Sequence, residues 1–180
     1  VRRCRLYETW DTRRTASGWR AGSGAVWNLR SNALRPAGWT SADAAGLPIL
    51  PGLLRWSEVR SGAVRHAIRF TAPTTAPRYL WPARHHAGSD RSAPPMGARF
   101  RLNADFDTSG YSKPTRVVLT AMKRYGLVLA DNGSPWYFQG ERTRAWPARL
   151  IEELKSVPGS AFDVVDTSGM RVEDGSARVR

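Results

Sequence analysis

Cysteine is nearly absent from this chain of 180 residues, which contains only Cys4. One cysteine excludes an intrachain disulfide framework and any zinc site built on cysteine pairs. We interpret Cys4 as a small buried hydrophobe. Long apolar runs are missing as well, since no stretch approaches the ~20 residues of a membrane-spanning helix. The sequence therefore predicts no membrane span.

Lysine and acidic residues are scarce. The chain has 25 Arg but only 3 Lys, and its 15 acidic residues leave a net charge of +13. We interpret the excess of Arg over Lys mainly as codon usage in a GC-rich genome. A charge of this size still predicts salt-sensitive binding to nucleic acids or anionic glycans. Polyanion binding therefore stays open as an alternative function.

The motifs that identify common enzyme classes are also missing. The chain has no phosphate-binding loop, no GxSxG nucleophile elbow and no dinucleotide fingerprint. The sequence accordingly indicates no particular cofactor, and it leaves the oligomeric state open.

Residue patterns predict a mainly β fold, a β-sandwich or barrel-like antiparallel core with two helices in the C-terminal half. Residues 1–166 are long enough for a single globular domain, and the polar tail 167–180 is expected to fray. The predicted helices are 112–126 and 147–157. The predicted strands are 4–11 and 18–29 as a hairpin, 63–72, 79–83, 98–106, 127–130 with 136–139 as its returning partner, and 161–165.

The segment from Asn28 to Val59 is rich in Pro, Gly and Trp and has little regular periodicity. Irregular segments of this length are often functional. This one is too apolar to be disordered, because eight of its Leu, Ile and Trp side chains, from Leu34 to Trp56, need burial. We expect it either to wall a cleft or to plug the end of a sandwich.

Several strings resemble a group of secreted bacterial proteins, mainly actinobacterial, that has no established activity. They are SNALRPAGWTSADAAGLPILPGL, HAIRFT, WPARHH, PPMGARFRL and ADNGSPWY. The resemblance runs from about Cys4 to Asp166 and implies an exported location. Members of the group are longer at the N-terminus, which implies that this chain is the C-terminal part of a longer protein.

The candidate catalytic residues are Asp43, His66, His85 and Asp131. A His66–His85 pair with either aspartate would form a His-His-carboxylate metal site or an acid–base pair. Each residue has a structural alternative: Asp43 as the cap of a short turn, Asp131 as part of an Asp-Asn-Gly turn, and His66 as a core side chain. His85 and His86 are expected to point to opposite sides of an extended backbone.

Glu58 and Asp105 are further candidates for a two-carboxylate glycosidase. Eight Trp is a high number for this length, and most are expected in the core, with one to three exposed. Flat aromatic faces beside polar groups suit sugar rings. We select Trp39 and Trp81 as substrate-binding residues, with Arg35 reading a polar or anionic group.

These patterns together favour a secreted protein that binds a polysaccharide or other glycan. If it is an enzyme, it is expected to be glycoside hydrolase-like and to cleave that polymer. The alternatives are binding of a polyanion or nucleic acid through an Arg-rich surface, and a structural cell-surface domain without catalysis.

Overall fold

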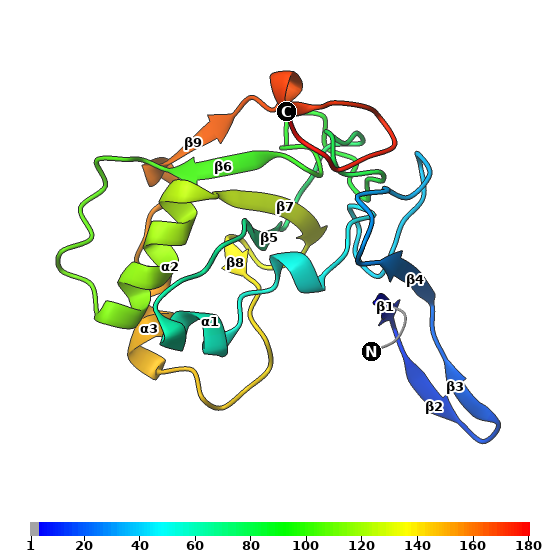
Figure 1. Ribbon diagram of the computed structural model, residues 1–180, viewed down its shortest axis with the longest axis horizontal. Helices are drawn as coiled ribbons and strands as arrows, with labels where there is room; N and C mark the ends of the chain where they lie inside the picture. Colours follow the sequence, from blue (N-terminus) through cyan, green and yellow to red (C-terminus); the bar gives the residue numbers. More distant parts are fainter. Residues whose placement is uncertain (1–3) are drawn as a thin grey trace.

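A five-stranded mixed sheet forms the centre of the protein (Figure 1). The structure is a computed structural model that describes residues 4–180. The strand order is β8-β5-β7-β6-β9; β5 and β7 are parallel, and the other neighbours are antiparallel. The strands are β5 (Ile68–Ala72), β6 (Arg99–Leu102), β7 (Leu127–Asn132), β8 (Tyr137–Phe138) and β9 (Phe162–Val165).

Three helices gather to one side of this sheet (Figure 1): α1 (Trp56–Ser61), α2 (Lys113–Arg124) and α3 (Ala148–Lys155). Successive side chains of a strand point to opposite faces, so each strand contributes to two environments. Ile68 and Leu127, which are paired, lie with α2 residues such as Leu119 in the main hydrophobic core. The next pair along, Arg69 and Val128, faces the other side of the sheet.

The N-terminal strands form a long hairpin that extends from the body (Figure 1). β1 (Arg5–Trp10) pairs antiparallel with β4 (Ser23–Asn28), and β2 (Arg13–Thr15) with β3 (Gly18–Arg20) continues the arm. The predicted hairpin is thus confirmed. Its base is fastened by Glu8, whose carboxylate accepts hydrogen bonds from the backbone N–H groups of Ile49 and Leu50 and from the indole of Trp27.

The segment 28–59 is largely irregular, as predicted, and it is packed against the sheet. It contains only the 3₁₀ turn η1 (Leu50–Gly52) and the start of α1. Ala45 and Leu54 are buried in the main core. The C-terminal tail, which was expected to fray, lies along this segment: Ala177 N–H donates to the Asn32 carbonyl, and Leu34 N–H donates to the Gly175 carbonyl.

The predicted fold class is correct only in part. Strands dominate and both C-terminal helices are present, but the sheet is open and mixed, so the barrel-like antiparallel core was wrong. A third helix, α1, lies in the N-terminal half. β8 pairs with β5 and not with β7, its predicted partner. Alternation of side chains reveals that a strand exists, but it carries no information about the neighbour.

No helix in residues 4–180 is both long enough and apolar enough to cross a membrane.

Candidate functional site

Three charged side chains meet where segment 28–59 crosses β5 and β7. Arg69 donates from Nη2 to Oδ2 of Asp43 at 3.0 Å, and the same nitrogen lies 4.0 Å from Oδ2 of Asp131. The side chains of Arg69 and Asp43 are almost completely buried, whereas 30% of the Asp131 side chain is exposed. Asp131 is therefore the one member of this group that an external ligand reaches easily.

Asp43 also closes the turn that carries it. Its Oδ1 accepts a hydrogen bond from the backbone N–H of Leu47 at 2.9 Å and another from the Ser41 hydroxyl at 3.3 Å. Burial raises the pKa of Asp43 to about 6, and the attraction of Arg69 offsets part of that rise. The side chain has no exposed surface. Its contacts show an internal role, positioning Arg69 and the turn 41–47.

A pocket of about 310 Å³ opens beside Asp131 and is lined by Trp10, Ser23 and His85 among others. We call it the Asp131 pocket. His85 Nδ1 lies 2.9 Å from the carbonyl oxygen of Ala44. A carbonyl oxygen only accepts, so Nδ1 carries the proton and Nε2 is left as an acceptor. Burial raises the pKa of Asp131. The pocket thus combines a carboxyl group, an imidazole acceptor and an indole.

Trp10 lines this pocket from the end of β1, and 59% of it is exposed. Its neighbour across the hairpin is Ser23, whose hydroxyl donates to the Ser41 carbonyl. The hairpin is thereby joined to the turn that holds Asp43. The sequence analysis did not select Trp10, although the alternation of Leu6, Glu8 and Trp10 on one face of β1 was the available signal.

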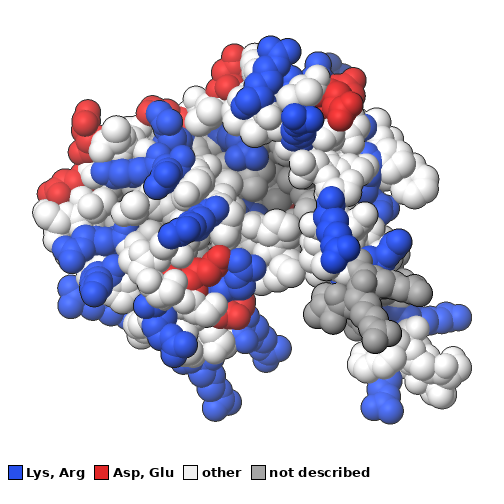
Figure 2. Space-filling model, in the orientation of Figure 1, with Lys and Arg blue, Asp and Glu red and all other residues white. Residues whose placement is uncertain are grey.

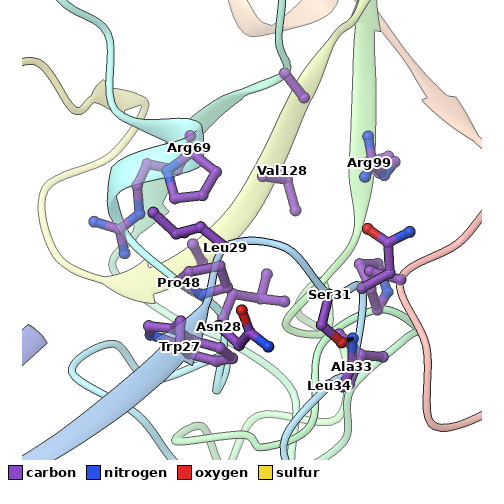
Figure 3. Close-up of a pocket in the computed structure, with 18 residues that line it drawn as sticks. Trp27, Asn28, Leu29, Ser31, Ala33, Leu34, Pro48, Arg69, Arg99 and Val128 are labelled. Carbon is purple, nitrogen blue, oxygen red and sulfur yellow. Dashed lines mark hydrogen bonds between the residues drawn. The ribbon is translucent and has the colours of Figure 1, made fainter. Parts of the chain in front are cut away.

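A second cavity lies on the other side of the Asp43–Arg69 pair (Figure 3). This cleft of about 370 Å³ runs between the sheet and the loop that follows β4. Arg69, Val128 and Arg99 are directly opposite one another on β5, β7 and β6, so their side chains share the face that floors it. We call it the Arg99 cleft. Much of its remaining wall is apolar and includes Trp27, Leu29, Leu34, Leu47, Pro48 and Pro51.

Arg99 carries a charge in the cleft that no acidic side chain balances. In the part of the chain that the structure describes, it forms no ion pair, and its buried Nε has no hydrogen-bond partner. Burial lowers the pKa of Arg99. Figure 3 shows Arg99 and Arg69 at opposite ends of the cleft, with Val128 between them. The sequence predicts a strand over 98–106, but nothing in that pattern singled out Arg99 as a site residue.

The predicted sugar-binding residues Arg35, Trp39 and Trp81 line neither of these two cavities. The Arg35 guanidinium stands 6.0 Å from the Trp27 ring and 5.4 Å from the Trp39 ring. Trp39 is 58% exposed, and with Trp10 and Trp19 it makes three strongly exposed Trp, within the expected range. Trp81 is half-buried, and its indole N–H donates to the Ser176 carbonyl, so it holds the C-terminal tail.

Two of the predicted arrangements are not found. His66 does not line the Asp131 pocket with Asp43, His85 and Asp131. Its Nε2 lies 3.2 Å from Glu58, and its Nδ1 lies 2.9 Å from the Ala67 carbonyl. The side chains of His85 and His86 do not point to opposite sides: their rings stack, with the ring centroids 5.8 Å apart. The loop after Pro82 is not a regular strand, so the alternation of side chains does not apply there. Asp105 is exposed in the loop after β6 and lines neither cavity.

The site shows no arrangement suited to a metal ion. In residues 4–180, no cluster of three His, Cys, Asp or Glu side chains could hold one.

Lys and Arg are spread over the face drawn in Figure 2, which is hollowed near its middle.

Comparison with known proteins adds no relative: no family model matches the chain, and no curated protein or solved structure matches it significantly.

Proposed function

We propose that this protein binds a glycan outside the cell and that the Asp131 pocket is its binding site. The observation that carries the proposal is the meeting of Asp131, His85 and the exposed Trp10 ring in one pocket of about 310 Å³. Sugars present apolar ring faces and hydroxyl groups, and they are recognised by an aromatic face beside hydrogen-bonding groups. The location outside the cell rests on the resemblance of the sequence strings to secreted proteins.

Binding is better supported than cleavage. A two-carboxylate hydrolase needs both carboxyl groups beside the scissile bond. The partly exposed side chain of Asp131 reaches a ligand in the pocket, and its raised pKa suits a general acid. Asp43 does not, because its side chain has no exposed surface and is held by Arg69 and the turn 41–47.

Replacement of Trp10 tests the proposal. We expect Trp10→Ala to weaken binding to the polysaccharide that the parent retains by about tenfold or more, equal to about 1.4 kcal/mol. Neutral polymers such as cellulose, chitin and mannan are the probes, at ~0.5 M salt so that charge-driven retention is screened. Trp19→Ala is the matched control, since Trp19 is 71% exposed on the same hairpin and does not line the pocket. Equal losses in both variants, or none in either, would refute this site.

A second candidate function, polyanion binding, is supported by a groove along α2. In the part of the chain that the structure describes, no carboxylate lines this groove, and its cationic lining residues are Arg65, Lys113, Arg116 and Arg124. The last three lie on one stripe of the helix, which suits the regular charges of a polymer. Retention on neutral glycans at ~0.5 M salt favours the first function, and retention only on DNA or RNA favours the second. If the protein is retained on none of these polymers, the remaining alternative is a structural domain without binding function.

A further inference from the structure

We propose that the Arg99 cleft is a subsite for a carboxylate group, so that the glycan recognised by this protein contains uronic acid. This inference rests on the proposed glycan-binding function and specifies the class of sugar. It is carried by the geometry of the cleft, in which an unpaired guanidinium stands at one end of a largely apolar cavity of about 370 Å³.

The charge balance of the cleft selects a ligand with one negative charge. Among residues 4–180, Arg69 and Arg99 are the only charged residues that line it, and Asp43 neutralises Arg69 through the 3.0 Å ion pair. One positive charge, that of Arg99, is left over. Arg99 is half-buried, and its buried Nε has no hydrogen-bond partner, so an anion that enters the cleft and binds the guanidinium stabilises the site. A polymer phosphate would find no lysine and no second free guanidinium here.

The form of the donor favours a carboxylate. A guanidinium presents its N–H groups as a planar fork that matches the two oxygens of a carboxylate. Polar groups of Asn28 and Ser31 lie on the loop side of the cleft, where Figure 3 shows them between Trp27 and Arg99, and they can serve sugar hydroxyls. Leu29, Pro48 and Val128 provide an apolar surface for the ring between the two arginines.

The two cavities are neighbours. Ala130 lines the Arg99 cleft, and the next residue, Asp131, lines the other pocket. The Asp43–Arg69 pair likewise stands between them, with one member in each wall. Adjacent subsites of this kind suit adjacent sugar units of one polysaccharide, with a uronic acid in the Arg99 cleft and a neutral sugar against Trp10.

The test compares sodium D-glucuronate with D-glucose, with binding followed by ¹⁵N-resolved NMR titration of the intact protein. We expect the parent to bind glucuronate with shifts at Arg99 and Val128, and glucose at least tenfold more weakly. Arg99→Gln should lose the glucuronate response while its Tm stays within a few degrees of the parent, because Arg99 is half-buried and forms no ion pair that the substitution would break. Arg101→Gln, an exposed arginine two residues along the same strand, should behave as the parent.

The outcomes separate this inference from the proposed function. If glucuronate does not bind while a neutral polysaccharide does, the carboxylate subsite is refuted and the glycan function stands. Binding of glucuronate that survives Arg99→Gln, or tighter binding of a sulfated sugar without a carboxylate, also overturns the subsite. If glucuronate binds through Arg99 and Trp10→Ala has no effect on any polysaccharide, the Asp131 pocket is wrong and the carboxylate site stands.

Discussion

At the scale of single residues, Asp43 performs two internal tasks that different substitutions separate. Asp43→Asn keeps an oxygen for the Leu47 N–H and leaves Arg69 facing Asp131 at 4.0 Å. We expect it to be at least as stable as the parent at pH 8. Asp43→Ala leaves the Leu47 N–H without its acceptor, which should cost about 1–3 kcal/mol. Chemical denaturation of both variants measures this, and equal losses would show that the negative charge itself holds the turn.

The pH dependence of stability checks the same residue. Burial raises the pKa of Asp43 from 3.8 to about 6, so the folded protein binds this proton more tightly than the unfolded chain does. The stabilisation that this proton gives to the folded state is fully present below about pH 4 and is lost as the pH rises through about 6. The free energy of unfolding changes by on the order of 3 kcal/mol over this range. Asp43→Asn should remove this decline in the free energy of unfolding between pH 4 and 7. An unchanged pH profile would show that Asp43 is ionised throughout that range.

At the scale of elements, Glu153 joins α3 to the start of α2. Its carboxylate accepts hydrogen bonds from the backbone N–H and hydroxyl of Ser112 and from the Thr115 hydroxyl. These donors lower the pKa of Glu153 to about 2. Ser112 immediately precedes α2, a position from which a serine side chain often caps a helix. It makes no such cap bond, and its hydroxyl donates to Glu153 instead.

Glu153→Gln should therefore loosen the contact between α2 and α3. A lowered pKa gives stability above pH 4.5 that is lost as the pH falls through about 2. We expect the Tm of the variant to be several degrees lower than that of the parent at pH 7. Between pH 4.5 and 2, the Tm of the variant should fall less than that of the parent. Glu152→Gln is the control, since its only ion pair is the exposed one with Lys155. A Glu152 variant as unstable as the Glu153 variant would contradict this assignment.

Sequence patterns predict elements much better than partners. The alternation around Phe100 and Leu102 located β6, and helical spacing from Val117 to Tyr125 located α2. Nothing local specified that β5 and β7 would pair in parallel, because that pairing depends on contacts far apart in the chain.

Some residues of the candidate site could be predicted from the sequence, and others could not. Asp43, His85 and Asp131 were selected from loop and turn positions, and the structure brings all three to one pocket. Arg99 and Trp10 were missed, since a charged residue on the polar face of a strand is normally solvated. Segment 28–59 packs over that face and forms much of the cleft in which the Nε of Arg99 is buried.

At the scale of the whole molecule, the net charge of +13 predicts some binding of polyanions, and the question is where on the surface it occurs. We expect the parent to bind heparin at low ionic strength and to elute as salt rises. If the groove along α2 is the contact, Arg116→Gln with Arg124→Gln should reduce the slope of log K against log salt by about two. Arg142→Gln with Arg144→Gln removes the same charge from the exposed loop before α3 and serves as the control. Equal reductions in both double variants would mean that heparin binds through net charge alone, without a specific surface.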